Sequence, residues 1–535
     1  MKSDVDARIL AAGVCPPQCG NDSTWSSGSS KGMERLREKF TFLHGVQLGT
    51  LLLAALGVRI FRIGTESLWF DECVTYMALH NPSIIGFFRE EAQYDPVMVP
   101  VYYGAAYIWY HLGFTSIVAV RMLSVVASLA AIIFLYFWTR SLFNHAAGLA
   151  AAVCMSFAKL QIYMSQEIRN YAFTMLLALV AMYLFHEAVK REKRTWWILS
   201  IAANIVLAYT HFFALLLLLA QGVFLLITRP KRILWIAGWT AVHLPFLALM
   251  PIWIHNIVSS PISETGWIPW APVNRLFDAY YFVFAGSLQD AMDFVRVLPF
   301  GIPVHHMLGV AMLAAGACYV SASAIFYLRK AIPMEGFKFD TSVMLVTWLF
   351  VPPTALFILG RIVQPCFIER YVLYSATALF IVAGGAIAVI PTQRLQHVAL
   401  CLLMLIFAGN LVDSARPLRH DFRSTGEVLA TEFQQGDKIF ACFDTLEMPL
   451  RYYANVPKDA IVGSEDFVQK ATSVALAGKR SWIWFIHVPD RFEPTLVESV
   501  AFHEGLKYQR WQFLGRWHTY LYRIEPHPNP VDAAA

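Results

Sequence analysis

The sequence predicts an α-helical polytopic membrane protein, with a long first outer loop carrying interfacial helices and a small α/β domain at the C-terminal end. Hydrophobic residues make up 57% of the 535 positions and charged residues 15%, whereas soluble domains carry about a quarter charged residues. Apolar runs of about 20 residues, enough to span a bilayer, recur up to position 412. Beyond it, short apolar runs alternate with helix-like polar segments, which is typical of a soluble α/β domain.

Residues 1–40 form the first predicted domain, a disordered cytoplasmic tail. The stretch 1–32 is rich in Ser, Gly, Asn and Asp and lacks the apolar run with basic flanks of a signal peptide. Cys15 and Cys19 form the one closely spaced cysteine pair, and no His or second cysteine pair accompanies them as a zinc site would require. Met33 precedes a basic cluster just before the first span, so translation from Met1 or from Met33 stays open.

Residues 41–412 form the predicted transmembrane domain, with about eleven spans by the length criterion. The expected spans are 43–61, 116–138, 146–163, 171–186, 196–209, 212–227, 234–253, 306–327, 342–359, 371–390 and 398–412. This path places the N-terminus inside and the basic clusters at 140, 190–194, 229–232, 329–330 and 394 on the cytoplasmic side, as the positive-inside rule requires. Counting 96–112 as a span would put Arg140 on the wrong side, so that segment is expected to be interfacial.

Residues 413–535 form the predicted extracytoplasmic α/β domain. Strands are expected at 438–443, 460–462 and 482–488, a helix at 466–477, and a hairpin of 508–513 with 517–522. No glycine pattern typical of a phosphate-binding loop occurs in it. Contact with the acceptor and a structural lid are both open as roles. The whole chain is expected to be a multi-pass protein of the inner, cytoplasmic membrane.

Asp71 and Glu72 stand out because they follow the first span directly. An ionisable residue at a membrane interface indicates function by default, and the flanking Trp69, Phe70 and Tyr76 are of the type that settles at the headgroup level. The alternative is that Asp71 is only the N-cap of a short interfacial helix over 71–80. Helix neighbours project about 100° apart, so one acid should act and the other support it.

Further polar residues fall on the same membrane face in this topology. Arginines bind phosphate oxygens with a bidentate fork, so Arg169 and Arg370 are the candidates for anion binding. The alternative is that Glu167–Arg169 and Glu369–Arg370 are plain interfacial ion pairs, which stabilise little when exposed. The candidates on this face are Glu167, Arg169, Tyr171, His211, Glu369, Arg370 and Tyr371.

These motifs together resemble a known group of membrane enzymes. The motifs are Leu68-Trp69-Phe70-Asp71-Glu72, Pro100-Val101-Tyr102-Tyr103, Arg121, Gln166-Glu167-Ile168-Arg169-Asn170-Tyr171, Tyr209-Thr210-His211-Phe212 and Glu369-Arg370-Tyr371. Over about residues 43–412 the chain is similar to the bacterial relatives of the protein O-mannosyltransferases and the aminoarabinose transferases. These are GT-C fold glycosyltransferases that use a polyprenyl-phosphate sugar. The stretch Pro96-Val97-Met98-Val99-Pro100 departs from their tighter Pro-Pro-Leu-Tyr pattern and leaves the acceptor open.

The resemblance implies a reaction and roles for these residues. Asp71 would be the catalytic base with Glu72 its neighbour, Glu167 the acid of the second loop, and Arg169 with Arg370 the holders of the lipid phosphate. A hexose such as mannose, or a pentose, would pass by inverting displacement to a hydroxyl of a lipid, glycan or protein acceptor. Tyr371 would assist phosphate binding, while His211, Tyr171 and Glu369 are further site candidates. Some relatives add a divalent metal near the acids, which this sequence neither requires nor excludes.

Other classes of protein fit the sequence less well. A secondary transporter also carries intramembrane acids, but transporters usually show related halves with interrupted helices near the bilayer midplane. Here the charges cluster at one interface and no internal repeat is seen. No basic tract with interleaved aromatic residues suggests nucleic-acid binding.

Overall fold

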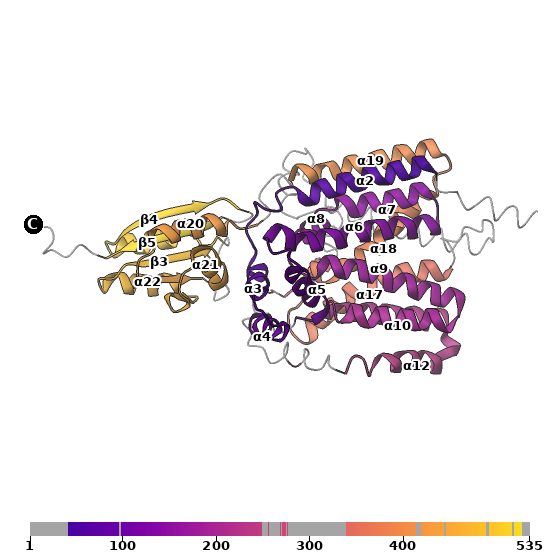
Figure 1. The fold of residues 1–535 in the computed structure, drawn as a ribbon, viewed down its shortest axis with the longest axis horizontal. Coiled ribbons are helices and arrows are strands. Elements are labelled where there is room, and N and C mark those ends of the chain that lie inside the picture. Colours follow the sequence, from indigo (N-terminus) through magenta and orange to yellow (C-terminus); the bar gives the residue numbers. More distant parts are fainter. Residues whose placement is uncertain are drawn as a thin grey trace, which may run out of the picture. The chain divides into compact units, whose positions relative to one another are not determined.

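The computed structural model describes residues 41–95, 98–248, 255, 268, 270–273, 275–276, 339–413, 419–442, 446–487, 492–515 and 518–526. The predicted tail over 1–40 and the predicted span over 306–327 lie outside these residues. Figure 1 draws the helices and strands of the described residues as a ribbon.

Five helical segments within the described residues are long and apolar enough to cross a membrane. They are α2 (Phe42–Ile60), α6 (Ile117–Leu142), α9 (Tyr171–Arg191), α17 (Phe339–Ile362), and η4 (Glu369–Ser375) continued by α18 (Ala376–Ala388). All five coincide with predicted spans. Two bent pairs of helices raise the count to seven if each pair is one span, so the predicted eleven is not reached within the described residues.

The first bent pair interrupts the predicted span 146–163, whereas the bend of the second pair lies between the predicted spans 212–227 and 234–253. α7 (His145–Phe157) and α8 (Lys159–Ser165) meet at 63°, and the segment Phe212–Thr228 meets Pro230–His243 at 113°. Pro230 explains the second bend, because proline has no N–H to continue the helical ladder. The second pair comprises η1 (Phe212–Ala214), α11 (Leu215–Thr228), η2 (Pro230–Arg232) and α12 (Ile233–His243). α10 (Arg194–Ala208) is a shorter apolar helix, and α19 (Gln393–Asp413) has 21 residues but is not among the five segments above.

Arg59 holds the break between α7 and α8. Its side chain is fully buried and donates hydrogen bonds to the carbonyl oxygens of Met155 (3.1 Å) and Ser156 (2.9 Å) and to Ser128 Oγ (2.9 Å). A helix that ends leaves its last carbonyl groups without partners in the helix. Arg59 supplies those partners, so this buried charge is structural.

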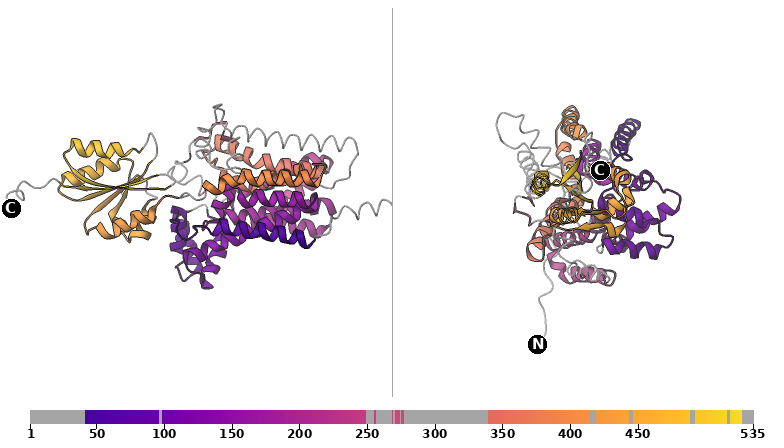
Figure 2. Two further views of the ribbon diagram at one scale, coloured as in Figure 1. Left: turned by 90° about the horizontal axis from the view of Figure 1, so that it is seen from above. Right: turned by 90° about the vertical axis from the view of Figure 1, so that its left-hand side faces the viewer.

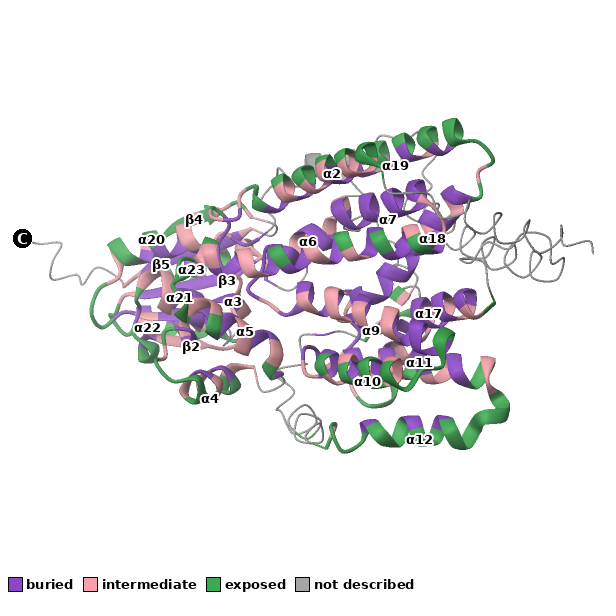
Figure 3. Ribbon diagram, turned by 45° about the vertical axis from the view of Figure 1, so that its right-hand side comes forward, coloured by how far each residue is buried: buried purple, intermediate pink, exposed green. Residues whose placement is uncertain are grey.

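The helices pack around α7 and α18, whose residues are nearly all buried (Figure 3). α6 contacts α7 and α9, and α18 contacts α7 and α17. Glycines permit the closest approach, since a Cβ on Gly384 would lie 2.5 Å from the backbone oxygen of Ala147. Such small residues are the usual contact points between membrane helices. The outward faces of α2, α12 and α19 carry exposed Leu53, Leu234 and Leu405, as expected for surfaces that face lipid.

The first loop carries short helices, as predicted, and three of them lie within the described residues. They are α3 (Phe70–Ala78), α4 (Ile84–Tyr94) and α5 (Pro100–His111). α5 has 12 residues, about 18 Å of helix, which is too short to cross a bilayer core of about 30 Å. The exclusion of 96–112 as a span therefore agrees with the structure.

The C-terminal region forms a five-stranded sheet of order β2-β1-β3-β5-β4 with helices on both faces (Figure 2). β1 pairs in parallel with β2 and β3, and β5 pairs antiparallel with β3 and β4. The central strand β3 is buried throughout, and Ile483 stands opposite Tyr522 of β5. The strands are β1 (Lys438–Ala441), β2 (Ile461–Gly463), β3 (Ser481–Ile486), β4 (Lys507–Phe513) and β5 (Thr519–Glu525), and the helices are α20 (Phe422–Glu432), α21 (Glu447–Ala454), η6 (Lys458–Ala460), α22 (Phe467–Leu476) and α23 (Pro494–His503).

Candidate active site

The acidic pair lies in the first turn of α3, which begins at Phe70 with Trp69 as its N-cap residue. Glu72, at the third helical position, accepts the backbone N–H of Trp69 at Oε2 (3.0 Å). A glutamate at this position commonly reaches back to the cap in this way. Asp71 is therefore not the N-cap, and the alternative that explained it as a helix cap is wrong.

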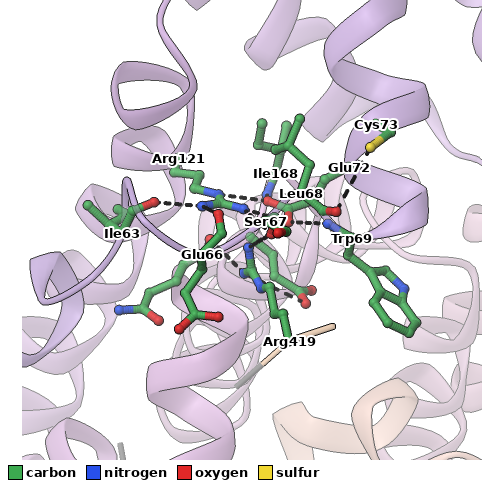
Figure 4. Close-up of polar contacts among 12 residues, drawn as sticks. Ile63, Glu66, Ser67, Leu68, Trp69, Glu72, Cys73, Arg121, Ile168 and Arg419 are labelled. Atoms are coloured by element: carbon green, nitrogen blue, oxygen red, sulfur yellow. Dashed lines mark hydrogen bonds and ion pairs between the residues drawn. The ribbon is translucent and has the colours of Figure 1, made fainter. Parts of the chain in front are cut away.

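Glu72 is fully buried between two arginines (Figure 4). Its Oε1 accepts from Arg121 Nε and from the Ile168 backbone N–H, both at 2.9 Å. Its Oε2 accepts from Arg121 Nη2 (2.9 Å) and Arg419 Nη1 (2.7 Å). Burial alone would raise the pKa of Glu72, but these guanidinium groups hold the pKa below its usual value. Glu72 is thus an ionised carboxylate whose oxygens are fully engaged by the protein.

Asp71 has different surroundings. Its side chain is 24% exposed, and Oδ2 lies 3.6 Å from Arg169 Nη2. At that separation the contact is electrostatic and not a hydrogen bond. Arg169 also donates from Nη1 to Asp95 Oδ2 (3.0 Å), which accepts from the Tyr103 hydroxyl as well (3.3 Å). Arg169 therefore pairs with Asp71 and Asp95, so the alternative of a plain Glu167–Arg169 ion pair is not supported.

Glu167 lies two residues before Arg169 and is buried. Its Oε1 is 4.0 Å from Arg419 Nη2, and its backbone oxygen accepts from Ser124 Oγ (2.7 Å). Burial raises the pKa of Glu167, while Arg419 and Arg370 oppose the rise. The second-loop acid is thus held beneath the surface of the site, close to positive charge.

A second cluster of side chains brings together Arg370 and Tyr371, His211, and Tyr171 at the start of α9. The Arg370 guanidinium lies 5.9 Å from the ring centre of Tyr171 and 5.7 Å from that of Tyr371, within cation–π range. The His211 ring lies 5.8 Å from each of the same two rings. Burial, with Arg169 and Arg370 nearby, lowers the pKa of His211 to about 3, so the imidazole is neutral at physiological pH.

Glu369 is separate from this cluster. Its buried carboxylate accepts a hydrogen bond from Arg275 Nε (2.6 Å). The alternative that Glu369 simply pairs with its neighbour Arg370 is therefore not supported either. Asp71, Glu167, Arg169 and Arg370 lie near enough to one another to interact electrostatically, which the sequence could only suggest from their shared membrane face.

Three residues near the site had no predicted role: Asp95, Glu91 and Arg419. Glu91 is fully buried, with Oε1 2.7 Å from Thr75 Oγ1. Burial, reinforced by Asp95, raises the pKa of Glu91 to about 8. The sequence carries little signal for them, because an acid on a short amphipathic helix and an arginine after the last span both look solvated.

The acids around α3 do not form a metal centre. Within the described residues no three His, Cys, Asp or Glu side chains come together as metal ligands. Asp71 and Asp95 instead face the guanidinium of Arg169. Because a cation of the protein already pairs with these two carboxylates, the donor set does not fit the divalent metal that some relatives hold.

Comparison with known proteins identifies the fold. Residues 96–255 match the family model for dolichyl-phosphate-mannose-protein mannosyltransferase. ArnT from Cupriavidus metallidurans bound to undecaprenyl phosphate superimposes with a TM-score of 0.51 at 12% identity, over 89% of this chain and 97% of that one. The Archaeoglobus fulgidus oligosaccharyltransferase in its apo form gives 0.48 at 12% identity, over 88% and 70%. No curated protein sequence matches significantly. The predicted resemblance is confirmed: this chain has the GT-C fold and resembles ArnT and the protein mannosyltransferases.

Proposed function

We propose that the protein is a membrane glycosyltransferase that moves a sugar from a polyprenyl-phosphate donor to a hydroxyl acceptor. The relatives support the donor class, since one solved ArnT structure holds undecaprenyl phosphate and the matching family model is named for a dolichyl-phosphate sugar. A hexose such as mannose is the proposed sugar. The active site and the C-terminal domain are proposed to lie on the extracytoplasmic side of the inner membrane.

One observation carries this proposal. Of the two adjacent acids, Asp71 is partly exposed beside the guanidinium of Arg169. Glu72 is buried and forms ion pairs with two arginines. A sugar phosphate already has a good leaving group, so transfer needs one base and positive charge on the phosphate. A hydrolase would instead use a pair of carboxyl groups as acid and base. One partly exposed carboxylate beside a guanidinium therefore favours glycosyl transfer over hydrolysis.

The proposed reaction is a single displacement. Asp71 takes the proton of the acceptor hydroxyl, and the acceptor oxygen attacks the anomeric carbon. The bond from that carbon to the phosphate oxygen breaks, and the polyprenyl phosphate leaves with the electron pair. Arg169 and Arg370, assisted by Tyr371, stabilise the negative charge of the departing phosphate. Attack opposite the leaving group inverts the anomeric centre.

The remaining site residues have supporting roles in this proposal. Glu72 fixes the orientation of α3 through Arg121 and the backbone of Ile168. Glu167 lies beneath the site near Arg419. His211 is neutral and packs between Tyr171 and Tyr371, so it adds no charge beside the phosphate.

The test uses purified protein in detergent with a panel of polyprenyl-phosphate sugars and hydroxyl acceptors. A transferase releases polyprenyl phosphate and forms a glycosylated acceptor in equal amounts. The secondary transporter, the competing class, would instead move solute into proteoliposomes and release no polyprenyl phosphate. Solute uptake without phosphate release would therefore contradict the proposal.

A further inference from the structure

One guanidinium connects the two chain segments that carry the proposed catalytic groups. Asp71 lies on α3 and Arg169 on the segment 166–170. Arg419 Nη1 donates to Glu72 Oε2 (2.7 Å), beside Asp71, and Nη2 donates to the backbone oxygen of Gln166 (2.9 Å), three residues before Arg169. Figure 4 shows Arg419 directed into the Glu72 cluster. A single side chain, 347 residues from Glu72 in sequence, thus ties both segments together.

Arg419 enters from the start of the C-terminal region, three residues before α20 begins at Phe422. The same region holds the loop that leads into α3. The Tyr453 hydroxyl accepts the Leu68 backbone N–H (2.7 Å), and the Arg423 backbone N–H donates to Ser67 Oγ (3.2 Å). The α/β domain therefore contacts the acid-bearing loop at several points.

The contact made by Arg419 is not required to balance the charge of Glu72. Arg121 already forms a bidentate pair with Glu72 and is held by the backbone oxygens of Ile63 (2.6 Å) and Glu66 (3.1 Å). Removing one partner of a buried pair is costly when it leaves an unpaired charge. Without Arg419, Glu72 would keep its pairing with Arg121, so a variant at position 419 is expected to fold.

We propose that Arg419 is a positioning residue for glycosyl transfer, and that the C-terminal domain completes the acid site by aligning Asp71 with Arg169. This inference rests on the proposed function. Catalytic groups contribute only when they are held in the reactive geometry, and a displacement of about 1 Å can lower the rate about a hundredfold. In this role the C-terminal domain positions the catalytic groups themselves. The two roles left open by the sequence, a structural lid and contact with the acceptor, do not include this.

The test compares Arg419→Gln and Arg419→Lys with a control arginine of the same domain, in the full-length protein. Arg480 is the control, because it pairs with Asp437 (2.6 Å) and donates to the Glu432 backbone oxygen (2.9 Å), away from the acid site. Arg419→Gln should lower kcat about a hundredfold with a smaller change in the donor KM. Arg419→Lys should recover part of kcat, since an ammonium replaces one contact but not the fork. Arg480→Gln should lower the melting temperature and leave kcat near the wild-type value.

A second readout does not depend on turnover. Hydrogen exchange of the backbone amides in 64–72 should become faster in Arg419→Gln and stay unchanged in Arg480→Gln. If Arg419→Gln and Arg480→Gln both lose kcat in proportion to the fall in their melting temperatures, the positioning role is wrong. It is also wrong if amide exchange becomes faster in Arg419→Gln while the kcat of that variant is unchanged. A wild-type protein that releases no polyprenyl phosphate would overturn the proposed function as well, so the two failures are distinguishable.

Discussion

Asp71 and Glu72 lie in the same helical turn, yet the surroundings of their carboxylates differ. Glu72 accepts hydrogen bonds from two arginines and two backbone N–H groups, whereas Asp71 keeps a partly exposed carboxylate beside Arg169. The sequence could predict that one acid acts and the other supports it, because helix neighbours diverge by about 100°. It could not predict which one, since the sequence does not show that Arg121 and Arg419, 49 and 347 residues away, both reach Glu72.

The arginines are the first residue-scale test. Arg169→Ala and Arg370→Ala should each weaken use of the lipid donor about ten- to a hundredfold, because a charged hydrogen bond contributes roughly 1.5 to 3 kcal/mol. Arg370→Lys should recover only part of this loss, as an ammonium lacks the planar fork. Donor titration of each variant measures the effect. Unchanged donor affinity in both alanine variants would assign these arginines to structure alone.

Glu91 is the second residue-scale test, through the dependence of stability on pH. The folded protein retains this proton up to a pKa of about 8, whereas the ordinary value is 4.5. Between these values the unfolded chain binds fewer protons than the folded one, so stability falls as pH rises, by about 3 kcal/mol between pH 5 and pH 7. Glu91→Gln should flatten this decline in melting temperature. If the melting temperatures of wild type and variant depended equally on pH, the conclusion that Glu91 is a buried neutral acid would be contradicted.

At the scale of elements, periodicity and length were good guides where a helix is continuous. α2, α6, α9 and α17 lie within a few residues of their predicted spans, and the strands of the C-terminal sheet lie close to the expected runs. The break between α7 and α8 is not predicted by the sequence. The bend between α7 and α8 depends on Arg59, which satisfies carbonyl groups on another helix, and a pattern read along one segment does not show such long-range partners.

Close contact between α7 and α18 gives a prediction at this scale. A Cβ on Gly384 would lie 2.5 Å from the Ala147 backbone oxygen, while one on Gly222 of α11 would meet nothing within 4 Å. Gly384→Ala should therefore destabilise the protein by about 1 to 3 kcal/mol through overpacking. Gly222→Ala is the matched control and should be neutral or slightly stabilising, because alanine favours helix. Thermal melts in one detergent compare them, and equal melting temperatures would argue against this packing.

For the whole molecule, the topology remains a prediction from the basic residues at 140, 190–194 and 229–232. Reporter fusions after residues 413 and 140 test it. The first should report an extracytoplasmic location and the second a cytoplasmic one, as the positive-inside rule requires. A cytoplasmic signal after residue 413 would contradict both the orientation and the shared outer face of the site.

The central claim is that Asp71 is the base of a lipid-dependent glycosyl transfer, and single-turnover release of polyprenyl phosphate tests it most directly. Asp71→Asn keeps the size of the side chain but cannot accept the proton. Because general-base catalysis contributes about 10²- to 10⁴-fold, the variant should lose at least a hundredfold in rate while binding the donor and melting like the wild type. Turnover of Asp71→Asn at the wild-type rate would contradict the mechanism.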